Sequence, residues 1–337
     1  MHYLVTGHTG FKGAWLTLLL VERGHKVSGV SLQPQSNSLF ISAGISKFLE
    51  REITCDIRDL EKLEEALSET NPDVIIHMAA QSLVRESYAD PITTFETNVN
   101  GTINVLQASQ AISSLKAQII VTTDKVYKNT HKLLGYVETD PLGGDDPYSA
   151  SKAMADIAAQ SWFNSFRHAP TAIARAGNVI GGGDVCADRL IPDLIDSFSK
   201  GISPKLRAPN SIRPWQHVLD CLNGYLILAE HLTINEQNGV WNFGPDKSQS
   251  KSVLDVANLA GSVWGFEKNW QVDKGVHPHE TEKLLLNSGK ARSKLGWYEK
   301  LNFEESVTWT VNWYKRVQEG MHPLEAMQSN IHDFELI

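Results

Sequence analysis

A glycine-rich turn near residue 7 separates an apolar run from an amphipathic stretch. Tyr3–Val5 is a candidate strand, and the segment GHTGFKG follows with its glycines, Gly7, Gly10 and Gly13, spaced GxxGxxG. Residues 14–23 then show helical periodicity. Glycines in this context permit a tight turn, close approach of backbone N–H groups to a pyrophosphate, and close packing of helix on strand. The pattern predicts a dinucleotide-binding site, with a plain strand–helix turn as the alternative.

The alternation of apolar and amphipathic segments extends this prediction to the whole N-terminal half. Further strands are predicted at residues 27–32, 52–55, 73–77, 118–122 and 171–175, and helices at 93–110 and 148–166. Strands alternating with helices at this spacing indicate a parallel sheet covered on both faces. The expected fold class is α/β, a doubly wound parallel sheet (Rossmann) with a smaller α/β C-terminal substrate-binding domain.

The rhythm changes after Asn178, which sets the expected domain organisation. Shorter helices are predicted at residues 189–200, 218–231, 253–264 and 303–318. We expect residues 1–177 to form the dinucleotide-binding domain, with residues 218–245 returning to it as a helix and a strand. Residues 178–217 and 246–337 are expected to form the nucleotide-sugar-binding domain.

Composition excludes several classes of protein. The 337 residues are 42% hydrophobic and 21% charged, which is ordinary for a globular protein, and no run approaches the roughly 20 apolar residues of a membrane span. The N-terminal residues do not resemble a secretory signal. A net charge of -8 without a basic block argues against nucleic acid as a partner. Cys55, Cys186 and Cys221 are far apart, which favours a reducing cytoplasm.

The residues alone leave the choice between NAD and NADP open. NAD sites usually carry an acidic residue after the second strand, but that strand ends at Ser31 and residues 24–48 contain no Asp or Glu. No arginine lies there to hold a 2′-phosphate, although Lys12 could do so. Asp56, after the third strand, is a candidate for binding the adenine amino group or for capping the following helix.

Tyr148 and Lys152 are four residues apart at the start of a predicted helix, so their side chains face the same way. A tyrosinate can take the proton of a sugar hydroxyl while hydride leaves for nicotinamide. The tyrosine pKa, near 10 when unperturbed, must then fall to roughly 7. Lys152 and an oxidised nicotinamide ring are the two positive charges that could lower it. An exposed helix pair without function is the alternative.

Thr123, Asp124 and Lys125 end the fifth strand, and the carboxyl ends of parallel strands face the ligand crevice. Thr123 can hydrogen-bond the oxygen that is oxidised. The adjacent acid and base suit a dehydratase: once C4 of a hexose is a ketone, a base removes the C5 proton and an acid protonates the leaving C6 hydroxyl. We expect Lys125, uncharged, to be the base and Asp124 the acid. A structural ion pair is the alternative.

Seven segments in order carry a family resemblance: TGHTGFKGAWL, TTDKVY, DPLGGDDPYSASK, RAGNVIGGGD, ADRLIPD, IRPWQHVLD and LGW. Together they resemble the extended short-chain dehydrogenase/reductase family, and within it the subgroup of CDP-glucose 4,6-dehydratases. The resemblance implies a cytoplasmic, NAD-dependent hydro-lyase (NADP is not excluded) that makes CDP-4-dehydro-6-deoxyglucose. Such a product feeds the deoxysugars of surface polysaccharide, such as lipopolysaccharide O-antigen. Lys125 stands where dTDP-glucose dehydratases carry glutamate.

The resemblance also implies roles for individual residues. The residues implied to bind the cofactor are Gly7, Thr9, Gly10, Phe11, Lys12, Gly13, Ser31, Asp56, Ile57, Ala79, Ala80, Gln81, Tyr148 and Lys152. Those implied to bind the nucleotide sugar are Asn178, Arg189, Leu190, Arg213 and His217. One pair departs from the resemblance, because Val185-Cys186 stands where Trp-Ala is expected. Ser31, which has no acidic neighbour, fits the subgroup but predicts weak retention of NAD.

Rival interpretations remain at this point. A nucleotide-sugar 4-epimerase needs Tyr148 but not the Asp124–Lys125 pair, a 4,6-dehydratase could act on another nucleotide sugar, and a non-catalytic NAD-binding regulator needs neither site. The spacing of His277, His279, Glu280 and Glu282 fits no standard metal site, so no metal is expected. Residues 92–111 and 154–166 could form a two-helix face that pairs with its copy in a homodimer or homotetramer.

Overall fold

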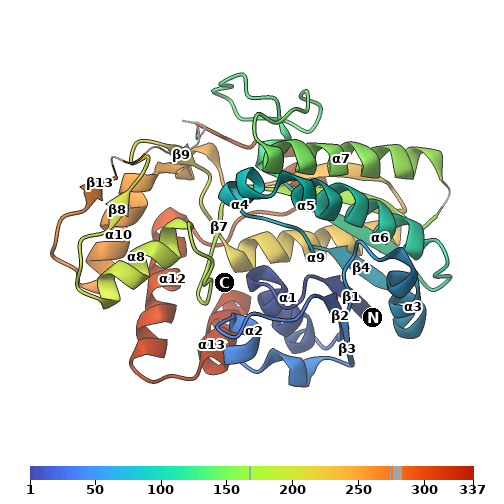
Figure 1. Ribbon diagram of the computed structural model, residues 1–337, viewed down its shortest axis with the longest axis horizontal. Helices are drawn as coiled ribbons and strands as arrows, with labels where there is room; N and C mark the ends of the chain where they lie inside the picture. Colours follow the sequence, from blue (N-terminus) through green and yellow to red (C-terminus); the bar gives the residue numbers. More distant parts are fainter. Residues whose placement is uncertain (167, 274, 276–282) are drawn as a thin grey trace.

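The computed structural model describes residues 1–166, 168–273, 275 and 283–337, and its centre is a twisted parallel sheet (Figure 1). Seven strands follow the order β11-β6-β5-β4-β1-β2-β3. Their bounds are β1 His2–Thr6, β2 Lys26–Ser31, β3 Arg51–Thr54, β4 Val74–His77, β5 Ala117–Thr123, β6 Thr171–Ala176 and β11 Gly239–Phe243. The strand order reverses between β1 and β4, which is where doubly wound sheets bind their ligands. The predicted α/β fold is confirmed.

Helices cover both faces of this sheet. One face carries α1 (Phe11–Glu22) and α9 (Val218–Asn235), and the other carries α3 (Leu60–Thr70), α6 (Gly101–Ser109) and α7 (Pro147–Ser165). Alternate residues of one strand therefore enter different cores: Tyr3 packs with α1, whereas Leu4 packs with α3 and α6. Because β11 pairs with β6 and α9 packs beneath it, this later segment of the chain is part of the first lobe.

Local signals set where the functional helices begin. α1 starts at Phe11, three residues before the predicted helix, because Gly10 is its N-cap residue. α7 starts at Pro147, where Asp146 accepts the N–H of Ser149 at 2.9 Å. The helix predicted at residues 93–110 is divided into α5 (Pro91–Phe95), a π-helical turn η2 (Glu96–Asn100) and α6.

A second lobe lies beyond the carboxyl ends of the strands and has its own core (Figure 1). That core packs α8, α10 and α12 around side chains such as Leu194, Phe198, Val256 and Val311. The bounds of its elements are β7 Val179–Ile180, α8 Leu190–Ser199, β8 Lys205–Leu206, β9 Ile212–Arg213, β10 Gln216–His217, β12 Lys251–Ser252, α10 Val253–Trp264, β13 Gln271–Val272 and α12 Phe303–Gln318.

The last helix, α13, returns to the first lobe. The remaining short elements are α2 Leu39–Ser42, η1 Ile45–Phe48, α4 Val84–Ala89, η3 Asp124–Val126, η4 Lys247–Gln249, α11 Gly289–Leu295 and α13 Pro323–Leu336. Ile331 and Phe334 of α13 are buried in the core that contains α1, and Glu335 pairs with Arg23 at 2.7 Å. The structure thus places α13 on the first lobe, although the expected boundary assigned residues 246–337 to the other one. Among the described residues, no helix combines the length and apolarity that a bilayer span requires.

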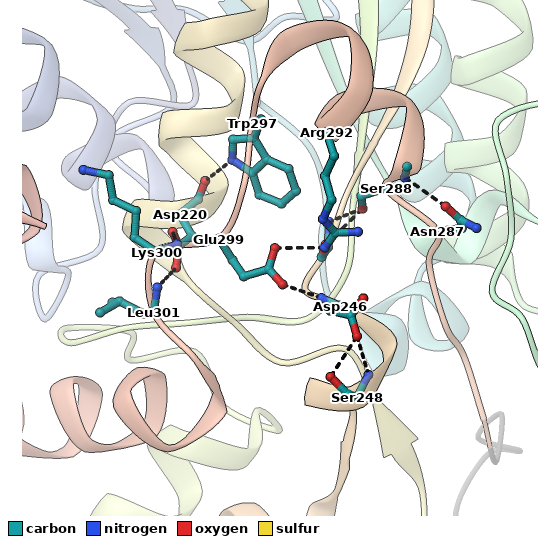
Figure 2. A network of polar contacts seen from close by, with 12 residues as sticks. Asp220, Asp246, Ser248, Asn287, Ser288, Arg292, Trp297, Glu299, Lys300 and Leu301 are labelled. Atoms are coloured by element: carbon teal, nitrogen blue, oxygen red, sulfur yellow. Dashed lines mark hydrogen bonds and ion pairs between the residues drawn. The ribbon is translucent and has the colours of Figure 1, made fainter.

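A polar network fastens residues 287–301 to the first lobe (Figure 2). Ser288 exchanges two hydrogen bonds with the backbone of Gly244, at 2.9 and 3.0 Å, directly after β11. Arg292 pairs with Glu299 at 2.9 Å, which closes the loop around α11. These contacts fix the path of the chain from the first lobe to α12.

Asp220 of α9 anchors the other end of this network (Figure 2). Its carboxylate accepts the N–H groups of Lys300 and Leu301 at 2.7 and 3.2 Å, and its carbonyl accepts the indole N–H of buried Trp297 at 3.2 Å. Burial raises the pKa of Asp220 to about 7, although the two N–H groups lower it. The folded protein therefore holds a proton on Asp220 that the unfolded chain releases.

We predict that replacing Asp220 by Asn changes how stability depends on pH. Because the folded pKa of about 7 exceeds the ordinary value of 3.8, the folded state binds the proton more tightly, and the Asp220 contribution weakens as pH rises from 4 to 7. Asn carries no titrating proton. The unfolding free energy of the wild type should therefore fall relative to that of Asp220→Asn as the pH rises over that range. Urea unfolding at several pH values measures this. Asp333→Asn, on the exposed face of α13, should show no such trend.

Candidate active site

A cleft of about 1240 Å³ lies between the strand ends and the second lobe. It brings together most of the residues that sequence reasoning assigned to the site. The predicted residues that line it are Gly7, Thr9, Gly10, Phe11, Lys12, Gly13, Ser31, Asp56, Ile57, Ala79, Ala80, Gln81, Thr123, Lys125, Tyr148, Lys152, Asn178, Arg189, Leu190 and Arg213. Asp124 and His217 are buried behind this lining instead.

The glycine-rich turn at residues 7–13 forms a narrow cradle. Its backbone packs so closely that a side chain at Gly7 or Gly13 would collide with other backbone atoms. Gly7 has φ +76°, and a Cβ there would lie 2.8 Å from the backbone nitrogen of Ala79. A Cβ on Gly13 would lie 2.2 Å from the carbonyl oxygen of Gly7. Gly10 caps α1 without a side-chain hydrogen bond, so the first N–H groups of the helix stay available to an anion. This geometry fits the pyrophosphate of a dinucleotide.

The adenosine side of the cradle is polar but carries no acidic residue at the end of β2. Thr9 and Ser31 share a hydrogen bond of 2.7 Å between their hydroxyls. Asp56 forms an ion pair with Arg58 at 2.7 Å, and this hydrogen-bonded partner lowers the pKa of Asp56. Asp59, not Asp56, caps α3, so the capping interpretation of Asp56 is wrong. The Asp56 carboxylate, which lines the cleft, is therefore already bonded to Arg58.

Lys12 points away from the cradle and toward α9. Its ammonium donates to the hydroxyl of Tyr225 at 3.1 Å and lies 5.2 Å from the centre of that ring. Burial lowers the pKa of Lys12, and Arg189 lowers it further. Tyr225 could not be predicted as a partner of Lys12, because 213 residues separate the two.

Tyr148 and Lys152 lie on the first turns of α7 and face the cleft. The Lys152 ammonium donates to the carbonyl oxygen of Val121 at 2.8 Å. Burial lowers the Lys152 pKa to about 8, with a further decrease caused by Lys12. Burial raises the Tyr148 pKa to about 12, which the nearby Thr123 hydroxyl and the charge of Arg189 oppose. Tyr148 thus rests protonated, and its activation requires additional positive charge.

Thr123, Asp124 and Lys125 form one hydrogen-bonded unit at the end of β5. Asp124 Oδ1 accepts the Thr123 hydroxyl at 3.0 Å and the Lys125 ammonium at 3.4 Å. Asp124 is fully buried, and its Oδ2 has no hydrogen-bond partner among the described residues. Lys125 reaches into the cleft and remains partly exposed. An acid and a base therefore lie next to the hydroxyl that faces Tyr148.

The second lobe contributes polar groups for an anionic ligand. Arg189 pairs with Asp184 at 2.9 Å and donates to Ser82 at 3.0 Å, and Arg213 also lines the cleft. Asn178 lines it too, and its Oδ1 is buried without a hydrogen-bond partner in the described chain. His217 is placed differently: it is fully buried as the N-cap residue of α9, between Trp15 and Trp309. This geometry does not support the contact with substrate that the resemblance implied.

Three charged residues that line the cleft were not predicted from the sequence: Arg85, Asp188 and Arg207. Asp188 pairs with Arg85 at 2.7 Å and with Arg207 at 3.0 Å. Arg85 lies on α4, Asp188 lies in the loop before α8, and Arg207 directly follows β8. Only the tertiary structure brings these three residues together. The stretch that contains His277, His279, Glu280 and Glu282 lies outside the described residues.

Comparison with known proteins agrees with the fold and the cleft. Residues 4–310 match the sequence family described as GDP-mannose 4,6 dehydratase. A CDP-glucose 4,6-dehydratase from Salmonella typhimurium is 41% identical over 98% of this chain and 95% of that protein. A dTDP-glucose 4,6-dehydratase from Bacillus anthracis, solved in complex with NAD, has a TM-score of 0.82 at 25% identity, covering 96% of this chain and 99% of that one.

The fold alone is shared more widely. A UDP-glucose 4-epimerase from Thermotoga maritima has a TM-score of 0.82 at 23% identity over 94% of this chain and 100% of that one. The architecture defines the class, a Rossmann-type epimerase/dehydratase. Within that class, the chain belongs to the GDP-mannose 4,6-dehydratase family of nucleotide-sugar dehydratases.

We predict that Ser31→Asp strengthens NAD binding about five- to tenfold. A carboxylate at the end of β2 can accept hydrogen bonds from the ribose hydroxyls, which a serine next to Thr9 does less well. Fluorescence titration of the purified protein with NAD measures the change. Ser113→Asp adds the same charge at an exposed position away from the cleft and should leave the affinity unchanged. An unaltered affinity in Ser31→Asp would contradict this assignment of the ribose site.

Proposed function

We propose that this protein is an NAD-dependent CDP-glucose 4,6-dehydratase, which converts CDP-D-glucose to CDP-4-dehydro-6-deoxy-D-glucose. The observation that carries the proposal is the Asp124–Lys125 pair, held beside Tyr148 and Thr123 in one cleft. An oxidoreductase that acts only at C4 needs no such pair. The choice of cytidine is supported by the 41% identity to the Salmonella enzyme over nearly the whole chain.

The first step is oxidation at C4. NAD, held by the glycine-rich turn at residues 7–13, would supply the hydride acceptor for C4 and the hydride donor for C6. Tyr148 takes the proton of the C4 hydroxyl, while Thr123 orients that oxygen through its own hydroxyl. Since burial raises the Tyr148 pKa to about 12, the positive charge of Lys152 and of the oxidised cofactor must offset this cost at the moment of transfer.

The second step is elimination of water across C5 and C6. Proton transfer from the Lys125 ammonium to Asp124, which lie 3.4 Å apart, yields a neutral amine and a neutral carboxylic acid. The amine then removes the C5 proton that the C4 ketone acidifies, and the acid protonates the C6 hydroxyl as the C6–O bond breaks. Lys125 returns its proton to C5 when C6 is reduced, and the proton that Tyr148 took from the C4 hydroxyl replaces the one that Asp124 gave to the leaving water, which restores the resting pair.

The proposal is tested by the mass of the product. Purified protein is incubated with NAD and, separately, with CDP-, dTDP-, GDP- and UDP-glucose. Loss of one water from CDP-glucose alone is the expected result. Loss of water from another nucleotide sugar would support the reaction but contradict the proposed substrate. Unchanged mass with an altered stereocentre at C4 would show an epimerase and contradict the proposed reaction.

We predict that Lys125→Met separates the two steps. Tyr148, Thr123 and Lys152 remain, so C4 oxidation should proceed and the reduced cofactor should accumulate, while loss of water falls by about 10²- to 10⁴-fold. Absorbance of the reduced cofactor and product mass are followed together. Lys128→Met removes an exposed lysine outside the cleft lining and should behave as wild type. Undiminished product formation by Lys125→Met would exclude Lys125 as the base.

The proposal includes a homodimer built on α5 and α7, which lie side by side on the surface (Figure 1). Ile92, Met154 and Ile157 are exposed on these helices at 70%, 49% and 54%, and Phe95 and Val99 line a shallow hollow between them. Four helices from two copies would bury this apolar face. We further propose a cytoplasmic location, which the three unpaired cysteines support.

We predict that Ile157→Asp converts the dimer to a monomer. A carboxylate on this apolar face would be buried without a partner on assembly. Light scattering at micromolar concentration gives the mass. Ile234→Asp changes a more exposed isoleucine, 78% accessible, at the end of α9 and should leave the mass unchanged. A wild-type monomer, or a mutant dimer, would contradict the proposed interface.

A further inference from the structure

One ion pair and one hydrogen bond cross the cleft from the loop of residues 184–189. Asp184 fixes the base of this loop to the second lobe, because its carbonyl accepts the Tyr314 hydroxyl at 2.7 Å. From there the loop reaches the first lobe twice: Arg189 donates to Ser82 at 3.0 Å, and Asp188 accepts from Arg85 at 2.7 Å.

Asp188 is the centre of this bridge. The same Oδ1 that accepts from Arg85 also accepts from Arg207 at 3.0 Å, and Arg207 holds the Asp188 carbonyl at 2.8 Å. The carboxylate thus contacts two guanidinium groups, one from each lobe. Its backbone has φ +64°, a left-handed conformation that Asp and Asn tolerate better than other non-glycine residues.

We propose that Asp188 is a positioning residue that latches the second lobe to the first over the bound nucleotide sugar. The inference rests on the proposed function, because that reaction requires the sugar to stay in place from C4 oxidation until C6 reduction. A sugar released between these steps would leave the cofactor reduced and the enzyme stalled.

The exposure of the pair suits a latch that must also open. Asp188 and Arg85 are each 43% accessible, so water competes for the same groups and the pair is weak. All three charged residues line the cleft, so opening of the Asp188–Arg85 contact separates its two walls. Arg207 keeps Asp188 attached to the second lobe when the contact to Arg85 breaks.

The test measures release of CDP in the absence of cofactor. Asp188→Asn keeps the size of the side chain and its tolerance of the left-handed conformation, and Arg207 can still hold the backbone carbonyl. The substitution removes the negative charge that Arg85 and Arg207 share. We expect CDP to dissociate about threefold to fivefold faster, by stopped-flow displacement of a fluorescent CDP analogue.

A double-mutant cycle makes the result specific to the latch. Asp188→Asn should accelerate release in the wild-type background but not in the Arg85→Met background, where the partner is already missing. Glu69→Gln, which removes an exposed ion pair to Arg51 outside the cleft, should leave release unchanged. With NAD and CDP-glucose present, Asp188→Asn should also accumulate reduced cofactor faster than wild type.

The outcomes separate the two proposals. Release at the wild-type rate from Asp188→Asn, or equal acceleration in both backgrounds, overturns the latch while the dehydratase stands. A wild-type protein that dehydrates a different nucleotide sugar and does not bind CDP overturns the proposed substrate together with this form of the latch.

Discussion

A buried ion pair between Arg175 on β6 and Asp156 on α7 determines where the reactive side chains stand. Two hydrogen bonds of 2.7 and 2.8 Å join the guanidinium to the carboxylate, and both side chains are at most 1% exposed. Thr122 donates to the same carboxylate at 3.0 Å. Since Asp156 follows Lys152 by one helical turn, this contact locks the rotation of α7 and aims Tyr148 and Lys152 at the cleft.

The cost of burying that pair is offset by a network that closes around it. Arg175 also donates to the Tyr127 hydroxyl at 2.9 Å, and Tyr127 donates to Asn242 of β11 at 2.7 Å. A buried charge without such partners would be strongly destabilising. The network therefore ties the edge strand β11 and the catalytic helix to one point. Since β11 follows the first segment of the second lobe in the sequence, this network is complete only after the chain has returned from that lobe to the central sheet.

Sequence reasoning succeeded where the functional geometry is local. The strand–turn–helix around Gly7 and the spacing of Tyr148 and Lys152 follow from neighbouring residues, because a cap and a helical period fix them. It failed where the partner is distant. Nothing near Lys12 indicates Tyr225, and nothing near His217 shows that its ring packs between two tryptophans rather than in the cleft.

Gly177 lies next to the buried carboxylate of Asp124. Asp124 Oδ2 has no hydrogen-bond partner in the described part of the chain, and a Cβ at position 177 would lie 3.5 Å from it. Gly177 itself lines the cleft, and Pro214 closes the space beyond it, 2.7 Å from the same Cβ position. A side chain at 177 would therefore cover the carboxyl oxygen and press on Pro214. In the proposed mechanism, Asp124 would protonate the C6 hydroxyl and Lys125 would approach C5 from the cleft. Because glycine adds no side-chain atom between the cleft and Asp124 Oδ2, a small residue at 177 is what the proposed elimination step would require.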